Sequence, residues 1–334
     1  MCSPPKLSIL FIITVMVFGE AVYAQQDYIQ HVHGSSSVDT SKIWLSHEHV
    51  LVDFIGADSI RPKSWSHHSI MTEVLPYLKD LANYKVNYFV DATPAYLGRD
   101  VLLLEKLATK TGLKIITNTG LYGARDNIFL PKYVEEITAD GLANKWINEF
   151  EKGIDGTTIK PGFIKIGVDT TDPLDILHQK LVKAAALTSL ETGLTIASHT
   201  GKAVGLWPQL EILEEMGGDV TKFIWVHAQA EEDNNSYLKA AAKGCWISLD
   251  GLGWDMDKHL SKLVFAKQHG ILHRILISHD AGWYDPQKDR QSITPYTDIF
   301  TKLLPALRTR GFSEKEISML LSVNPTKAFA IERE

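Results

Sequence analysis

The sequence predicts an α/β protein whose single domain is a (β/α)₈ (TIM) barrel. From residue 40 onward, eight short β-rich runs alternate with amphipathic helical segments. This alternation indicates parallel strands joined by right-handed crossovers, as in closed barrels and open doubly wound sheets. An open sheet would bind a nucleotide through a glycine-rich first turn, and residues 53–56 lack that spacing. The closed barrel is therefore the expected architecture.

The eight runs have the apolar, β-branched character of buried strands. They cover residues 43–52, 86–93, 113–121, 162–169, 194–200, 223–229, 245–251 and 274–280. Helical patterns lie between them at residues 100–111, 133–152, 174–192, 210–216 and 236–243. A capping box of Ser313 and Glu316 begins a last helix. No linker interrupts this order, so residues 25–334 are expected to form one barrel domain.

Residues 1–24 have the pattern of a secretory signal peptide. Lys6 precedes an apolar stretch at residues 7–18, and the small residue Ala24 stands where a signal peptidase would cut. An uncleaved membrane anchor is the alternative, but Gly19 and Glu20 end the apolar stretch before it could span a bilayer. We therefore expect cleavage after Ala24 and a secreted or periplasmic protein.

The composition limits the partners of the mature chain. The net charge is −6 and no basic block is present, so neither nucleic acid nor a membrane surface is expected to bind. Cys245 is the one cysteine beyond the signal peptide, which excludes an intramolecular disulfide. A small molecule is the expected partner. Pairing as a homodimer is compatible with the sequence, although no segment specifies an interface.

The first predicted strand carries the motif His47-Glu48-His49. Side chains alternate across a strand, so the two imidazoles share one face while Glu48 points to the other. Burying two such bases side by side is unfavourable unless a partner pairs or coordinates them. The motif therefore predicts a metal site, with Glu48 hydrogen-bonded on the outer face of the barrel.

Further polar residues stand at the ends of other predicted strands, where barrel active sites lie. They are Lys165, His199, His227 and Asp280. A single strand histidine is usually a hydrogen-bonded core residue, and an aspartate at a strand end is often a loop cap. Recurrence at several strand ends favours a shared site instead. Asp250, which ends the seventh predicted strand, is left open between a loop cap and a partner of the ligands.

Lys165 is the residue that distinguishes between two possible types of catalytic site. It lies in the buried-type strand Phe163-Ile164-Lys165-Ile166, and lysine is almost never fully buried without a partner. One option is a Schiff-base lysine, which needs no metal and leaves the histidines unexplained. The other is an amine that burial deprotonates and that takes up CO₂. The resulting carbamate is an anionic ligand able to bridge two cations.

The strand-end motifs resemble those of the phosphotriesterase family of the amidohydrolase superfamily. The motifs that carry the resemblance are Ser46-His47-Glu48-His49, Phe163-Ile164-Lys165-Ile166, Ser198-His199-Thr200, Val226-His227 and Ser278-His279-Asp280. The similarity runs from about residue 32 to residue 326, nearly the whole mature chain. His-x-His alone would not be specific, but the set is.

The resemblance implies a centre of two divalent metal ions, usually zinc. The implied ligands are, for the buried ion, His47, His49 and Asp280, and, for the more exposed ion, His199 and His227. Carboxylated Lys165 (N6-carboxylysine) and a hydroxide would bridge the ions, and the hydroxide would attack the substrate. Asp280 would orient it and accept its proton. Asp280 and Lys165 are therefore the predicted catalytic residues.

Aromatic residues in the predicted loops suggest the substrate. Tyr122, Trp254 and Trp283 are the candidates for the substrate pocket, and Tyr122 stands where lactonases of the resembled family place an aromatic residue over the metals. Such a lining fits a neutral ester or lactone better than a phosphate monoester, which would need several arginines.

Two further features bear on the reaction. Arg125, Lys288 and Arg290 stand in nearby loops and leave a polar or sugar-derived lactone open. Ala230 and Gly251 occupy the places where efficient phosphotriesterases carry a proton-relay Asp and His. The expected function is therefore hydrolysis of a lactone or related carboxylic ester, with organophosphate triesters as a side activity. A dedicated phosphotriesterase and an exported, non-catalytic metal- or ligand-binding protein are the alternatives.

Overall fold

The computed structural model describes residues 1–2, 27–61 and 65–332. Apart from its first two residues, the predicted signal peptide (1–24) lies outside this range. Within the described residues, no helix combines the length and the hydropathy that crossing a bilayer would need.

All eight predicted barrel strands are present, and each lies inside its predicted run. They are β3 (Ile43–Leu51), β4 (Val86–Asp91), β5 (Lys114–Ile116) with its continuation β6 (Asn118–Thr119), β7 (Phe163–Gly167), β8 (Ile196–His199), β9 (Phe223–Val226), β10 (Trp246–Leu249) and β11 (Ile275–Ile277). A short antiparallel hairpin, β1 (Tyr28–His31) and β2 (Gly34–Ser37), precedes them.

The barrel strands form two parallel arcs. One runs β6-β7-β8-β9-β10-β11 and the other β12-β3-β4-β5, where β12 (Gly282–Tyr284) is an additional short strand. The third strand, broken at Thr117, joins the arcs on one side. On the other side, the Asp280 amide donates to the His47 carbonyl at 3.1 Å. The predicted (β/α)₈ fold is confirmed.

β12 was not predicted, and glycine explains how it fits. Gly282 has φ +98°, and a Cβ there would lie 1.9 Å from the His49 carbonyl oxygen. Only a residue without a side chain lets this segment pair closely with β3. The segment after β11 is thereby held beside the His47-Glu48-His49 motif.

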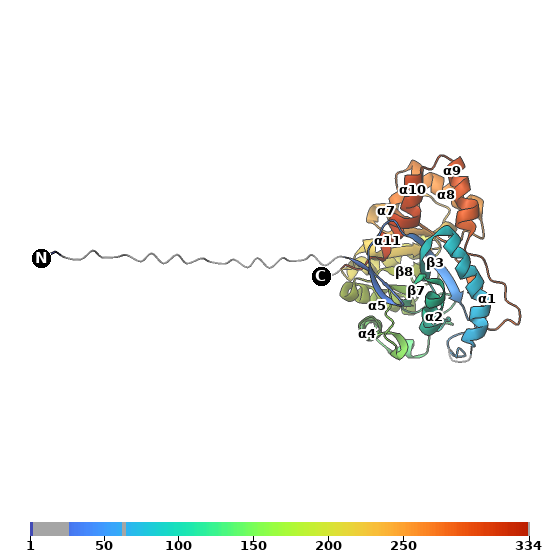
Figure 1. Cartoon of the computed structure of the whole chain (residues 1–334). Coiled ribbons are helices and arrows are strands. Elements are labelled where there is room, and N and C mark those ends of the chain that lie inside the picture. Colours follow the sequence, from blue (N-terminus) through green and yellow to red (C-terminus); the bar gives the residue numbers. More distant parts are fainter. Residues whose placement is uncertain (3–26, 62–64, 333–334) are drawn as a thin grey trace.

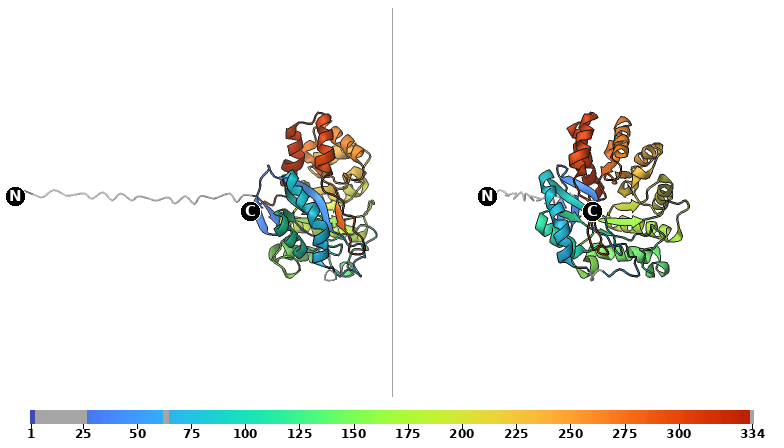
Figure 2. Two further views of the ribbon diagram at one scale, coloured as in Figure 1. Left: turned by 45° about the vertical axis from the view of Figure 1, so that its right-hand side comes forward. Right: turned by 90° about the vertical axis from the view of Figure 1, so that its right-hand side faces the viewer.

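Helices surround the strands in chain order, from blue α1 to red α11 (Figures 1 and 2). They are α1 (His67–Asp80), α2 (Val101–Thr111), α3 (Tyr133–Glu136), α4 (Ala139–Lys152), α5 (Ile176–Thr192), α6 (Leu206–Glu215), α7 (Asn235–Lys243), α8 (Met256–Gln268), α9 (Leu304–Thr309), α10 (Glu314–Ser318) and α11 (Asn324–Phe329). The predicted helix 133–152 is divided into α3 and α4, because Ile137 is extended and Thr138 caps α4. The predicted capping box begins α10.

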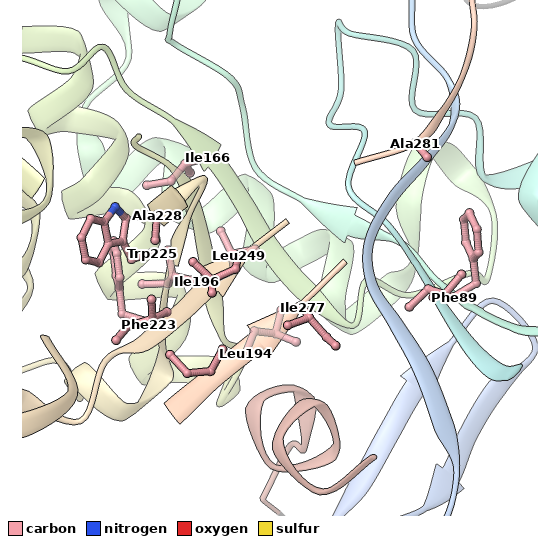
Figure 3. Close-up of a cluster of buried hydrophobic side chains, with 14 of the residues drawn as sticks. Phe89, Ile166, Leu194, Ile196, Phe223, Trp225, Ala228, Leu249, Ile277 and Ala281 are labelled. Carbon is pink, nitrogen blue, oxygen red and sulfur yellow. The ribbon is translucent and has the colours of Figure 1, made fainter. Parts of the chain in front are cut away.

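Two apolar layers hold the barrel together. Outward-facing strand residues pack beneath the helices, and Figure 3 shows Ile196, Leu249 and Ile277 gathered on neighbouring strands. Inward-facing residues near the starts of the strands form a second layer, in which Trp44 stacks on the Tyr88 ring at 4.1 Å. The barrel interior is therefore apolar at the amino ends of the strands. At their carboxyl ends it is polar.

Candidate metal centre

The two histidines of β3 face the barrel interior because of an irregularity in the strand. Trp44 belongs to the inner apolar layer and Leu45 to the outer one, so strict alternation would point Glu48 inward. The register of pairing with β4 shifts between Leu45 and Glu48. Beyond this irregularity, the residues that would have faced outward face the barrel interior. His47 and His49 consequently share the inner face, with ring centroids 5.4 Å apart and side chains almost fully buried.

Asp280 lies against both of these imidazoles. Its Oδ1 atom is 2.9 Å from His49 Nε2 and 3.6 Å from His47 Nε2. The three potential ligand atoms lie within 4.8 Å of one another. Bonds of about 2.0–2.2 Å to a tetrahedral cation would separate its ligand atoms by roughly 3.4 Å. These three side chains therefore fit one metal ion.

His199 and His227 form a second pair beside the first. His199 is the last residue of β8, and His227 follows β9 in a left-handed conformation with φ 60°. Their ring centroids are 4.4 Å apart, and the His227 ring is 5.3 Å from the His47 ring. Asp280 also has a positive φ, 55°. Such strained backbone at two potential ligands is typical of functional sites.

Lys165 extends from β7 into this group. Its side chain is almost fully buried, and among the described residues its Nζ has no hydrogen-bond partner. Burial lowers the pKa of the amine to about 8. Burial, with a smaller contribution from the neighbouring Lys165 charge, lowers the pKa of His47 to about 4. Burial and the same charge also help to lower the pKa of His199. The amine thus lies among the imidazoles rather than among the outer helices.

Asp250 contacts one histidine of each pair through that histidine's Nδ1 atom. Its carboxylate accepts a 2.7 Å hydrogen bond from His227 Nδ1 and lies 3.4 Å from His47 Nδ1. Although burial opposes ionisation, these two imidazoles hold the pKa of Asp250 well below its usual range. A carboxylate only accepts, so the proton of His227 sits on Nδ1 and Nε2 keeps its lone pair for a metal. Of the two roles left open, Asp250 is thus the partner of the ligands.

An aromatic wall runs from His49 of the first histidine pair to His199 of the second. It consists of Trp283, Phe54, Phe129 and Tyr122. Successive ring centroids are 5.5, 6.0 and 5.8 Å apart. Trp283 lies 5.3 Å from the His49 ring, and Tyr122 lies 5.0 Å from the His199 ring. Burial and the Asp280 charge raise the pKa of the Tyr122 phenol, which stays neutral. The wall presents a largely apolar surface beside the candidate metal ligands.

Of the three predicted pocket residues, the structure brings Tyr122 and Trp283 to the site but not Trp254. The Trp254 side chain is 70% exposed and makes no ring contact with the imidazoles or with the wall within the described residues. It lies in the turn that follows β10.

Sequence reasoning missed two contributors to the site. Thr93 Oγ1 lies 2.7 Å from His49 Nδ1 and orients that ring, and Phe129 is fully buried in the aromatic wall. Thr93 ends the second predicted strand run, and this position was a usable signal. Phe129 lies in a loop, where nothing in the sequence separates a wall residue from ordinary packing.

A cavity of about 810 Å³ lies elsewhere, against the outer side of β6 and α4. None of the candidate metal ligands lines it. Its buried charge is satisfied, because Arg99 donates to both carboxylate oxygens of Glu149 at 3.0 and 2.8 Å. It therefore does not compete with the barrel interior as the candidate active site.

The fold and the site together define a (β/α)₈ barrel of the metal-dependent hydrolase type. The model of the phosphotriesterase family matches residues 29–329, and the chain belongs to this family of hydrolases. The resemblance that the strand-end motifs carry is thereby confirmed.

Named relatives and a solved structure extend this result. An aryldialkylphosphatase of Saccharolobus solfataricus is 31% identical over 317 residues, covering 89% of this chain and 98% of that protein. An N-acetyltaurine hydrolase of Mus musculus is 28% identical, covering 71% of each. A mutant organophosphorus hydrolase of Deinococcus radiodurans matches with a TM-score of 0.82 and 25% identity, covering 93% of this chain and 100% of that one.

Proposed function

We propose that this protein is a binuclear metal-dependent hydrolase that cleaves a lactone or related carboxylic ester. The observation that carries the proposal is the buried Lys165 amine, which has no hydrogen-bond partner among the described residues. Its charge acts on the imidazoles of His47, His199 and His227, and the Asp280 charge acts on it. Such a group is unfavourable unless it is modified or coordinated. Asp280 Oδ1 points to the same conclusion, because it is buried between His49 and His47 at 2.9 and 3.6 Å without an aligned hydrogen bond.

The donor set divides into two groups that suit zinc. His47, His49 and Asp280 would hold one ion. His199 and His227 would hold the other, with carboxylated Lys165 as the shared ligand. Two cations would supply an acidified water and polarise the substrate oxygen.

The chain's own residues would prepare and complete the reaction. The neutral Lys165 amine forms its bond to CO₂ and releases one proton to solvent, which its lowered pKa favours near neutral pH. Asp250 fixes the tautomer of His227, and Thr93 orients His49. Asp280, close to both β3 imidazoles, receives the proton of the attacking water. The aromatic wall excludes water from one side of the substrate.

The region of the missing relay supports an ester over a phosphotriester. A Cβ at Gly251 would lie 2.5 Å from Gln229 Nε2, and Gln229 is itself held by Asp250 at 3.2 Å. A relay histidine at position 251 would displace Gln229. Phosphotriester hydrolysis stays the second candidate, because a relative is named aryldialkylphosphatase. Amide hydrolysis is the third, since another is named N-acetyltaurine hydrolase.

A substrate comparison tests the proposal. We expect kcat/KM of the zinc-loaded protein for a panel of lactones to exceed that for an aryl dialkyl phosphate by at least about tenfold, the discrimination that differential transition-state binding commonly gives. The reverse order would make the protein a phosphotriesterase. Tight ligand binding without hydrolysis of any ester or amide would favour the non-catalytic alternative. We further propose that the protein is exported, on the pattern of residues 1–24.

A further inference from the structure

The loop after β6 holds an unusual backbone. Arg125, Asp126 and Asn127 all have positive φ, at 66°, 56° and 61°. Non-glycine residues rarely adopt this conformation, and three in a row are unfavourable unless other contacts hold them. Asp169, beyond β7, accepts hydrogen bonds from the Arg125 and Asp126 amides at 2.7 and 3.2 Å. The loop is therefore fixed by a dedicated carboxylate.

This loop places the Arg125 guanidinium over the aromatic wall. Its central carbon lies 5.4 Å from the Phe54 ring centroid and 5.6 Å from that of Phe129. Among the described residues, no other lysine or arginine contacts a ring of the wall. Cation–π contact positions a guanidinium, whose N–H donors lie in its plane.

The guanidinium has no acceptor of its own. Within the described part of the chain, no carboxylate forms an ion pair with Arg125, and its side chain donates no hydrogen bond. Asp169 is engaged by the backbone amides and lies 3.9 Å from His178 Nε2. An ordered, solvent-exposed cation is thus available at the rim of the site.

The rings beneath Arg125 lead directly to the metal ligands. Phe129 contacts Tyr122, whose ring meets His199, and Phe54 contacts Trp283, whose ring meets His49. One aromatic ring therefore separates the rim cation from each ring that touches a ligand.

We propose that Arg125 is a specificity-determining residue that binds an anionic group of the substrate. Resting on the proposed function, this names the substrate class as an ester or lactone that carries a free carboxylate several bonds from the scissile carbonyl. The carboxylate would accept from the in-plane donors of Arg125, while the chain between the two ends lies along the aromatic wall. A wholly neutral lactone would leave the rim cation unused.

A matched substrate pair tests this assignment. Mono-p-nitrophenyl adipate carries a free carboxylate, and its methyl-capped diester has the same leaving group and the same chain. We expect the zinc-loaded protein to prefer the monoester. Arg125→Gln should reduce kcat/KM for the monoester about tenfold more than for the diester, chiefly through KM, because the contact is equal in ground and transition states. Added salt should reduce the preference of the unaltered protein.

Two further variants make the result decisive. Arg125→Lys keeps the charge and should retain part of the preference. Arg310→Gln removes an exposed arginine that directly follows α9 and should keep the whole of it. Equal losses on both esters in Arg125→Gln, or no loss on either, would overturn the assignment while leaving the hydrolase proposal intact. Hydrolysis of neither ester, of no lactone and of no amide by the metal-loaded protein would refute both.

Discussion

The two faces of β3 carry polar networks that differ in one respect. On the outer face, Glu48 accepts from Ser278 Oγ at 2.7 Å, His279 Nδ1 at 2.7 Å and the Ala281 amide at 2.9 Å. His279 Nε2 in turn accepts from the Ile299 amide at 2.9 Å, so this network is closed. The prediction that Glu48 is hydrogen-bonded on the outer face is confirmed, and the structure adds His279 as one of its partners.

The inner network, one residue away along the same strand, is open. Lys165 Nζ is buried and has no hydrogen-bond partner within the described residues. Asp280 Oδ1 is also buried and faces His49 Nε2 at 2.9 Å without an aligned hydrogen bond. A buried polar group without a partner is unfavourable, while a satisfied one stabilises the fold. The outer network therefore serves stability. The inner one leaves buried polar groups unsatisfied, as the proposed metal ions and carboxylated lysine would require.

The largest expected effect comes from removing the central group of the open network. Lys165→Ala should lose bound metal and reduce kcat/KM by about 10³-fold, a loss of roughly 4 kcal/mol of transition-state stabilisation. Metal analysis and ester hydrolysis on the same sample measure this, and added short-chain carboxylic acids should restore part of both by replacing the carbamate. The matched control is Lys262→Ala, which removes another buried lysine whose pKa is lowered to about 8 and should keep its metal. Full activity of a metal-free Lys165→Ala protein would contradict the account.

The closed network should respond in stability instead. Glu48→Ala removes the acceptor of several buried donors and should lower the free energy of unfolding by about 3 kcal/mol. Urea unfolding measures the change, and the folded fraction should still bind metal. Glu48→Gln keeps an acceptor and should lose less. If Glu48→Ala released metal without loss of stability, the distinction between the two faces would be wrong.

The open network should also have a pH signature in the metal- and CO₂-free protein. The pKa of Lys165 is about 8 in the folded chain against 10.5 for the free side chain, so the unfolded state binds more protons between these values. Stability should therefore rise with pH through this window. Lys165→Met should be more stable than the unaltered protein by up to about 3 kcal/mol below pH 8. This advantage should disappear as the pH approaches 10.5, and a pH-independent difference in urea midpoint would show that the amine is not buried as described.

A smaller effect is expected at Asp250, which contacts one histidine of each pair. Asp250→Asn keeps the shape but loses the charge that fixes His227 and His47. Metal affinity should fall about 10- to 100-fold, as for other hydrogen-bonded partners of metal ligands. Competition with a chelator measures it. An unchanged metal affinity would indicate that Asp250 is a loop cap and does not support the metal ligands.

The sequence predicted the strands and the polar residues at their ends well, for a physical reason. Strand periodicity is local, and a lysine or histidine within an apolar run stands out from its neighbours. The match of β3, β7 and β8 to their predicted runs follows from this. The shift between Leu45 and Glu48 was not predictable, because it arises from pairing with β4, about 40 residues further along.

Long-range contacts set the remaining features. Asp250 pairs with His227, which is 23 residues away, and the sequence left its role open. The aromatic wall joins Phe54 and Phe129, from two separate loops, with Trp283 of β12. Trp254, a candidate for the substrate pocket, has an exposed side chain in this structure. Loop positions of this kind follow from packing, which no local pattern encodes.

Anomalous diffraction at the zinc edge, from crystals grown with zinc and bicarbonate, tests the central claim most directly. The account predicts one peak among His47, His49 and Asp280, a second beside His199 and His227, and electron density that extends beyond Lys165 Nζ between them. A single peak with a bare lysine, or zinc bound elsewhere on the barrel, would contradict it.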